Sequence, residues 1–201
     1  RSKDKIYSLR DKIQSLGGKS LALPIDVSKP NEILKLKKHA ELFGETTVII
    51  NNAGIGKFSK IEDVSLEAWN LHMDINLRAS FLISQAFIPK MKKLKKGMLI
   101  FINSVAGKMG YPNSTAYTAS KFGLTGFANS LREELREDKI KVVSIHPGAV
   151  DTPFWNNKGV DFPRNEMLKP EHIAEFIIHA INSPDNLTIE ELVIRRVGGD
   201  F

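Results

Sequence analysis

Hydrophobic positions recur along the chain in two kinds of segment. Some segments place apolar residues three or four positions apart, as one face of a helix does, and others are short apolar runs typical of buried strands. The first kind predicts helices over 6–16, 31–43, 66–93, 114–136 and 171–182. The second kind predicts strands over 21–25, 47–50, 98–102, 141–145 and 192–195. Strands that alternate with helices of this length predict one α/β domain over residues 1–201, built on a doubly wound parallel sheet.

Proline modifies one of these elements. Pro89 lies near the end of the helix predicted over 66–93. Proline has no backbone N–H and its ring crowds the preceding turn. The sequence therefore predicts a break in this helix at Pro89.

Composition indicates a soluble globular domain. The chain has 201 residues, of which 42% are hydrophobic, enough to bury a sizeable core. It has no apolar stretch of about 18 residues, so we expect no membrane span. It has no cysteine, which excludes disulfides and thiolate metal sites and is compatible with a cytoplasmic location. The five histidines show no metal-ligand spacing, so we expect no bound metal.

The formal net charge of +6 raises the question of a nucleic-acid partner. Most of the local excess comes from five lysines, Lys90, Lys92, Lys93, Lys95 and Lys96. They precede a predicted strand, which places them at the amino edge of the sheet as a solvated connection. Few aromatic residues are interleaved with them for base stacking. We therefore expect neither nucleic acid nor a membrane as a partner.

Polar residues and glycines follow the predicted strands directly. Asp26 follows the first strand, 51–54 the second, 103–104 the third and 147–148 the fourth. In open parallel sheets, ligands bind at this carboxyl edge. Turn formation alone would explain each glycine, but it would not explain why polar residues gather at one edge. The pattern therefore favours a shared cleft.

Tyr117 and Lys121 are candidates for the chemistry in that cleft. Residues four apart on a helix share a face, so Lys121 can place its charge beside the Tyr117 phenol. A phenol has an ordinary pKa of about 10, and a positive neighbour lowers it toward the range useful for acid/base catalysis. Ser104 can hydrogen-bond a substrate oxygen near that hydroxyl. An isolated Tyr-x-x-x-Lys is usually a coincidence, but together these residues predict proton transfer to or from a carbonyl or alcohol.

Several short motifs occur in an order and spacing shared with a known family. They are Asp26-Val27, Asn51-Asn52-Ala53-Gly54, Asn76, Asn103-Ser104-Val105-Ala106-Gly107, Tyr117 with Lys121, and Pro147-Gly148-Ala149-Val150-Asp151-Thr152. Over nearly its whole length the chain resembles the short-chain dehydrogenase/reductase family. The resemblance implies a Rossmann-like fold and an NAD(P)-dependent oxidoreductase.

The resemblance also implies a role for each motif. Tyr117 would be the general acid/base, Lys121 would lower its pKa and hold the nicotinamide ribose, and Ser104 would orient the substrate carbonyl. Asn76 would support a water chain to the lysine, or it is a buried amide that closes a helix kink. Besides Tyr117 and Lys121, the implied cofactor-binding residues are Asp26 and Val27 near the adenine, Asn51, Ala53 and Gly54 along the cofactor, and Pro147, Gly148, Val150 and Thr152 at the nicotinamide carboxamide.

One motif of the family is absent from these residues. The chain has no glycine-rich phosphate loop, because Gly54-Ile55-Gly56 is only a G-x-G. The resemblance places that loop before residue 1, so we expect about forty further residues there, forming a βαβ unit whose strands lie between those at 21–25 and 47–50. Arg1 resembles a basic residue that receives the 2′-phosphate of NADP, although plain surface charge is the alternative. We therefore expect NADP rather than NAD.

The substrate is less well defined. The segment 154–169 carries Phe154, Trp155, Phe162 and Met167, and it is either a lid over a partly apolar substrate or a loop that packs on a neighbouring subunit. The segment 186–201 departs from the usual ending of 3-oxoacyl carrier-protein reductases, so a 3-oxoacyl compound is only one candidate. A catalytically silent cofactor sensor is the alternative function, although such a protein would be expected to lack the tyrosine or the lysine.

The two longest predicted helices also suggest self-association. The helices over 66–93 and 114–136 resemble those that pair between subunits in the family, which implies a homodimer or homotetramer. Their apolar residues exceed what one stripe buries against a sheet. These residues are Phe81, Phe87, Phe122, Phe127 and Leu131.

Overall fold

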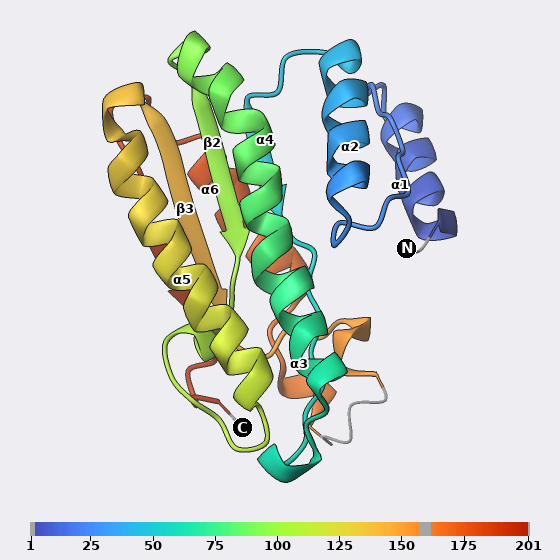
Figure 1. Ribbon diagram of the computed structural model, residues 1–201, viewed down its shortest axis with the longest axis vertical. Helices are drawn as coiled ribbons and strands as arrows, with labels where there is room; N and C mark the ends of the chain where they lie inside the picture. The colour runs from blue at the N-terminus through green and yellow to red at the C-terminus, as the bar shows by residue number, and fades with distance from the viewer. Residues whose placement is uncertain (1–2, 157–161, 201) are drawn as a thin grey trace.

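The computed structural model describes residues 3–156 and 162–200, and within them a parallel sheet forms the centre (Figure 1). Its four strands run in the order β1 (Val48–Asn51), β2 (Gly97–Ile102), β3 (Ile140–Pro147) and β4 (Glu191–Ile194). All three pairings are parallel. The four carboxyl ends therefore lie at one edge of the sheet.

Helices cover both faces of this sheet. α4 (Ala79–Leu94) and α5 (Thr115–Leu135) lie on the near face in Figure 1, and α6 (Pro170–Ile181) lies behind. Because side chains alternate along a strand, Leu99 and Phe101 of β2 pack against Leu124 of α5. Ile100 belongs to the opposite cluster, together with Ile173 of α6. The predicted α/β class with a doubly wound parallel sheet is confirmed.

The remaining helical elements are α1 (Lys3–Ser15), α2 (Pro30–Phe43), α3 (Leu66–His72), the π-helical segment η2 (Met73–Arg78), and the short 3₁₀ turns η1 (Ile61–Asp63), η3 (Val105–Gly107), η4 (Arg136–Asp138), η5 (Pro153–Trp155) and η6 (Arg164–Glu166). In Figure 1, α1 and α2 stand beside the β1 end of the sheet rather than over the strands.

The strand predicted over 21–25 is wrong. This segment has no regular secondary structure, and none of the four strands of the described residues pairs with it. An apolar extended segment becomes a strand only when a neighbouring backbone supplies its hydrogen bonds. β1 pairs with β2 alone, so its other edge has no strand among the described residues.

The helix predicted over 66–93 is interrupted, but at a different place. α4 runs through Pro89 as far as Leu94, so the predicted break is wrong. Gln85 and Pro89 are both exposed, so water can bond the Gln85 carbonyl that loses its usual N–H donor. The irregularity lies instead in η2, between α3 and α4. Single π turns inside helices are often found at functional sites.

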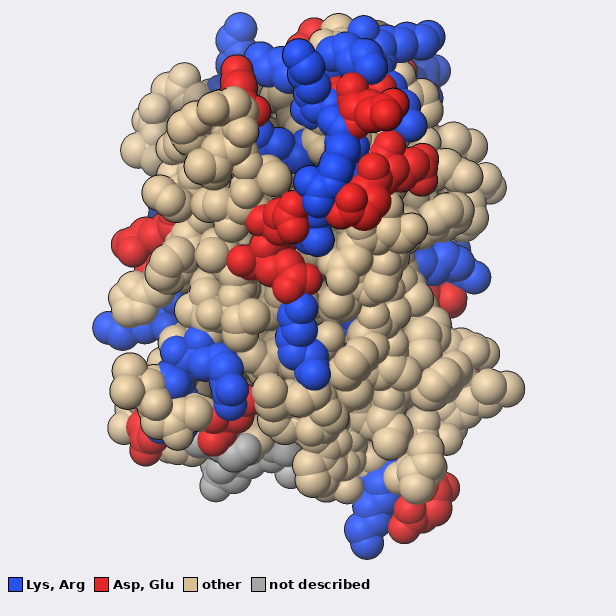
Figure 2. Space-filling view, turned by 90° about the vertical axis from the view of Figure 1, so that its left-hand side faces the viewer, with Lys and Arg blue, Asp and Glu red and all other residues tan. Residues whose placement is uncertain are grey.

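The lysine run lies where the sequence predicted it, at the amino end of β2. Lys92 and Lys95 form ion pairs with Asp138 at 3.2 and 2.8 Å. Figure 2 shows the charged side chains of this face concentrated over its upper half, with both signs side by side. Among the helices that the structure describes, none is long and apolar enough to cross a membrane. The described residues also include no group of three or more side chains placed to hold a metal ion.

Candidate functional site

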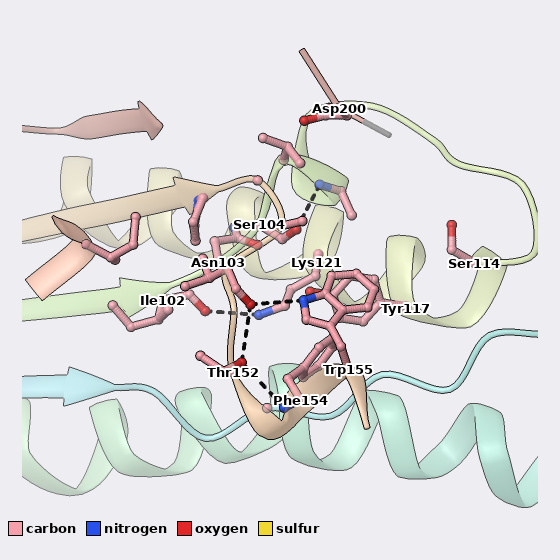
Figure 3. A pocket seen from close by; sticks show the side chains of 18 of the residues that line it. Ile102, Asn103, Ser104, Ser114, Tyr117, Lys121, Thr152, Phe154, Trp155 and Asp200 are labelled. Carbon is pink, nitrogen blue, oxygen red and sulfur yellow. Dashed lines mark hydrogen bonds between the residues drawn. The ribbon is translucent and has the colours of Figure 1, made fainter. Parts of the chain in front are cut away.

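A cavity of about 650 Å³ opens at the carboxyl edge of the sheet. Its walls come from the segments that follow the four strands, from the beginning of α5 and from one side of α6 (Figure 3). Eight of the predicted site residues line it: Gly54, Ser104, Tyr117, Lys121, Pro147, Gly148, Val150 and Thr152. The cleft predicted from the strand ends is therefore present, and it includes the three residues expected to perform the chemistry.

Lys121 lies at the base of this cavity. Its side chain is only 4% exposed, and Nζ donates a hydrogen bond to the carbonyl oxygen of Ile102 at 2.9 Å. Nζ also lies 5.8 Å from the centroid of the Tyr117 ring. Burial lowers the pKa of Lys121 to about 8, because the protein interior solvates the ammonium group less well than water does. At neutral pH Lys121 is still mostly charged.

Tyr117 is surrounded by other rings. The ring centroids of Phe58 and Phe154 lie 5.6 and 6.0 Å away, and that of His72 lies 6.3 Å away. Burial raises the pKa of Tyr117, and a hydrogen bond with the Ser104 hydroxyl offsets only part of that effect. The sequence predicted a lowered pKa for Tyr117, but in this structure the loss of water around the phenolate outweighs the hydrogen bond from Ser104. Tyr117 is therefore protonated at neutral pH and suited to donate a proton.

Ser104 is held between β2 and η3. Its hydroxyl oxygen accepts a hydrogen bond from the backbone N–H of Ala106 at 3.1 Å, which begins the 3₁₀ turn. Gly107 ends that turn against α5, where an added Cβ would lie 2.9 Å from the backbone oxygen of Lys121 and 2.8 Å from Asn103 Oδ1. The glycine therefore allows the turn that carries Ser104 to pack directly on the helix that carries Tyr117 and Lys121.

Asn76 connects three segments beneath the cavity. Its Oδ1 accepts from the backbone N–H of Ile55 at 2.8 Å, and its Nδ2 donates to the carbonyl of Ile55 at 3.0 Å. Nδ2 also donates to the Ser120 hydroxyl of α5 at 2.9 Å. The side chain is 1% exposed and does not line the cavity. These contacts tie the π turn to the loop after β1 and to α5, and both alternatives for Asn76 stay predictions.

The predicted adenine contacts lie away from the cavity. Asp26 and Val27 are not among its lining residues. The carboxylate of Asp26 accepts hydrogen bonds from the backbone N–H and the hydroxyl of Ser28, at 3.1 and 2.8 Å, in the turn before α2. Arg1 lies outside the described residues. A cofactor role for these three residues stays a prediction.

The predicted cofactor-binding residues at the end of β1 and just after it differ in their access to the cavity. Asn51 and Ala53 are not among the lining residues, but Asn51 is 6% exposed, and neither polar atom of its amide has a hydrogen-bond partner among the described residues. Gly54 faces Lys121, since an added Cβ would lie 3.9 Å from Nζ. Among the described residues the Asn51 amide therefore keeps free hydrogen-bonding capacity, and a cofactor role for Asn51, Ala53 and Gly54 stays a prediction.

Several lining residues have no signal in the sequence. Phe58, Tyr111, Ser114 and Asp200 were not predicted, although all four line the cavity. The Tyr111 hydroxyl donates to Asp200 Oδ2, which Arg195 also contacts at 2.9 Å. Burial and this hydrogen bond raise the pKa of Tyr111. In Figure 3, Asp200 lies on the other side of Ser104 from the aromatic cluster. Only folding brings these residues together.

The segment after β3 contributes aromatic rings to the same wall. Trp155 stacks on Phe58 with ring centroids 5.7 Å apart and an interplanar angle of 13°. Its Nε1 donates to the carbonyl oxygen of Val150 at 3.1 Å. Phe154 and Phe162 also line the cavity, whereas residues 157–161 lie outside the described residues. These contacts place the rings of Phe154, Trp155 and Phe162 in the cavity wall, and both alternatives for 154–169, a lid and a subunit contact, stay predictions.

Comparisons with known proteins agree with this geometry. A family model described as short chain dehydrogenase matches residues 1–161. A sepiapterin reductase of Chlorobaculum tepidum is 32% identical over 177 residues, which cover 88% of this chain and 72% of that protein. An uncharacterized oxidoreductase of Staphylococcus epidermidis is 32% identical over 190 residues, covering 94% of this chain and 82% of the relative.

Solved structures show the same fold. A metagenomic short-chain oxidoreductase in complex with NADP has a TM-score of 0.84 at 28% identity. An alcohol dehydrogenase from the archaeon Thermococcus sibiricus, complexed with 5-hydroxy-NADP, has a TM-score of 0.89 at 27% identity. Each match covers 98% of this chain and 83% of the other chain. On its sequence matches and its architecture, this chain belongs to the short-chain dehydrogenase/reductase family and is an NAD(P)-dependent oxidoreductase.

Proposed function

We propose that the protein transfers a hydride between NADP(H) and a carbonyl or alcohol substrate, with Tyr117 as the general acid/base. One observation carries the proposal: a protonated phenol, hydrogen-bonded to Ser104 and placed over the buried Lys121, lines a cavity of about 650 Å³. The nicotinamide cofactor supplies the hydride, and the protein supplies position and charge.

In the direction of reduction, the chain's own residues act on the carbonyl oxygen. The hydroxyls of Ser104 and Tyr117 bond this oxygen and hold it in the position where negative charge develops. Tyr117 then donates its proton to the oxygen as the alcohol forms. The raised pKa of Tyr117 keeps this proton in place beforehand. The ammonium group of Lys121 stabilises the phenolate that remains, so the same pair works in reverse for oxidation.

NADP is the proposed cofactor, because two similar solved structures contain NADP or 5-hydroxy-NADP. Gly54 and Lys121 would lie along the ribose, and the segment 147–152 beside the nicotinamide carboxamide. The carbonyl substrate would pack on the aromatic wall, which suits a partly apolar compound. A 3-oxoacyl thioester is one candidate, and sepiapterin is another because one relative is a sepiapterin reductase.

The test is a panel of substrates with the full-length protein. Ketones, aldehydes, 3-oxoacyl thioesters and sepiapterin are each mixed with NADPH or NADH, and the loss of absorbance of the reduced cofactor is followed. We expect turnover with at least one carbonyl, and faster turnover with NADPH. Tight NADPH binding without consumption in any mixture would instead support a catalytically silent sensor.

We also infer that copies of the protein associate through α4 and α5. Phe87 and Leu131 are buried and Phe127 packs on the core, so fewer apolar residues are exposed than the sequence suggested. Phe81 and Phe122 are nevertheless 41% and 45% exposed. Light scattering at micromolar concentration should report a dimer or tetramer, and a monomer would reject this inference.

A further inference from the structure

A buried histidine that the proposed reaction does not use contacts the backbone of Ser104. His146, the residue before Pro147 at the end of strand β3, is 0% exposed, and its Nδ1 lies 3.1 Å from the carbonyl oxygen of Ser104. A carbonyl oxygen can only accept a hydrogen bond, so Nδ1 carries the proton. In the neutral ring, Nε2 is then left as an acceptor.

The other side of the ring faces an ion pair. Nε2 has no hydrogen-bond partner among the described residues, and it lies 3.9 Å from Glu191 Oε1 of β4. The second carboxylate oxygen of Glu191 accepts from Lys108 Nζ at 2.5 Å. Lys108 directly follows η3, the turn that Ser104 begins. Two neighbouring strands therefore contact both ends of one short turn, His146 at Ser104 and Glu191 at Lys108.

Burial is the main reason why the His146 ring disfavours a second proton. Burial lowers the pKa of His146, and the positive charges of Lys108 and Lys121 act in the same direction. The hydrogen bond to Ser104 and the charge of Glu191 oppose this, but they offset only part of it. Protonation at acid pH would create an Nε2–H that competes with Lys108 for Glu191. It would thereby loosen the far end of the turn.

We propose that His146 is a positioning residue for the reaction: its Nδ1–H holds the carbonyl of Ser104, and thus the Ser104 hydroxyl, in place against Tyr117. The Glu191–Lys108 ion pair holds the other end of the same turn. This inference rests on the proposed function, in which Ser104 orients the substrate oxygen. Small displacements of such orienting groups are costly, since a shift of about 1 Å can reduce turnover about 100-fold.

Two substitutions at His146 test whether the hydrogen bond to Ser104, rather than the volume of the ring, is needed for turnover. In His146→Asn, the amide N–H takes the place of Nδ1 and keeps the bond to Ser104. In His146→Gln, the amide reaches the place of Nε2 instead, beside Glu191. We expect kcat within about 3-fold of the wild type for the first and lower by about 10- to 100-fold for the second, with KM for NADPH unchanged in both. His172→Asn, at an exposed position of α6, is the control and should change nothing.

The pH dependence of kcat distinguishes a positioning role of His146 from a purely structural one, because a purely structural role would leave this dependence unchanged. The wild-type kcat should fall at acid pH, as His146 protonates below its ordinary range, and this fall should be absent from His146→Asn. Equal kcat values for the Asn and Gln variants, or an unchanged acid limb in His146→Asn, would overturn the proposal.

A second readout does not depend on turnover. In protein labelled with ¹⁵N-histidine, nuclear magnetic resonance should show His146 as the Nδ1–H tautomer with a lowered pKa. An Nε2–H tautomer would overturn the proposal whether or not a substrate has been found. Absence of turnover with every carbonyl, together with the expected tautomer, would reject the proposed reaction and leave the contact with Ser104 established.

Discussion

Two regions of this molecule have similar helical patterns but very different surroundings. α1 buries none of its residues and α2 buries only Ile33, whereas α5 buries a residue on almost every turn, including Lys121. Leu9 and Leu42, in the first region, are 59% and 79% exposed. α5 lies on β2 and β3, while no described strand pairs with the segment between α1 and α2. An apolar stripe predicts a helix and its face, but burial requires a sheet beneath that face.

The largest expected effect is the loss of turnover in Tyr117→Phe, which changes the chemistry of α5 but not its packing. Tyr117→Phe keeps the ring against Phe58 and Phe154 but removes the transferable proton, so turnover should fall about 10²- to 10⁴-fold. Folding and cofactor affinity should stay close to those of the wild type. Steady-state kinetics over a range of pH, with Tyr7→Phe of α1 as the unaffected control, makes the measurement. Near-normal turnover of Tyr117→Phe at any pH would remove Tyr117 from the mechanism.

A pair of leucines tests the difference in burial directly. Leu124 is 1% exposed in the cluster between α5 and the sheet, so Leu124→Ala should lower the free energy of unfolding by about 2–5 kcal/mol. Leu42, at 79% exposed, should change it by less than about 0.5 kcal/mol when replaced by Ala. Urea unfolding of both variants provides the comparison. Similar losses would mean that α2 is buried as deeply as α5.

The smallest expected effect is a gain in stability. Burial lowers the pKa of Lys121 from 10.5 to about 8, so the folded state binds this proton less tightly than the unfolded state does. The buried ammonium group therefore lowers the free energy of unfolding by about 3 kcal/mol. This loss of stability is fully present below pH 8, and it fades as the pH rises from there toward 10.5, the pKa of Lys121 in the unfolded chain. Lys121→Met removes it but leaves the Ile102 carbonyl without its donor, for a net gain of about 1–2 kcal/mol at pH 7.

The same substitution should lower turnover, because the charge beside Tyr117 is lost. The wild type without cofactor should become more stable between pH 8 and 10, whereas the Met variant should not. Thermal unfolding at several pH values measures this, with the exposed Lys12→Met of α1 as the control. A Met variant less stable than the wild type at pH 7 would show that the buried ammonium group stabilises the fold.

Local patterns were sufficient for the part of the site built on β2 and α5. The apolar run over 98–102 and the stripe over 114–136 are long and unambiguous, and they correspond to β2 and α5 nearly to the residue. Because parallel strands end at a common edge, the residues that follow them had to meet there. The positions of Ser104, Tyr117 and Lys121 were therefore predictable from sequence, together with the α/β class.

Features that depend on distant neighbours were not predictable. The segment 21–25 has the pattern of a strand, but pairing is decided by another part of the backbone. α4 continues through Pro89 because of where that turn lies relative to solvent. The pKa of Tyr117 is raised because rings from other segments exclude water from the phenol. Asp200 reaches Tyr111 across 89 positions of sequence, which no local pattern indicates.

Trp155 lines the cavity, so its intrinsic fluorescence can report ligand binding there. Its indole stacks on Phe58 and donates to the carbonyl of Val150, in the segment proposed to lie beside the nicotinamide. The chain has one other tryptophan, Trp69 of α3. A ligand that enters beside Val150 changes the polarity around the indole, and with it the wavelength and intensity of its emission. A Trp69→Phe variant therefore contains a single tryptophan, and its emission on excitation near the red edge of tryptophan absorption reports when the site fills, without any attached dye.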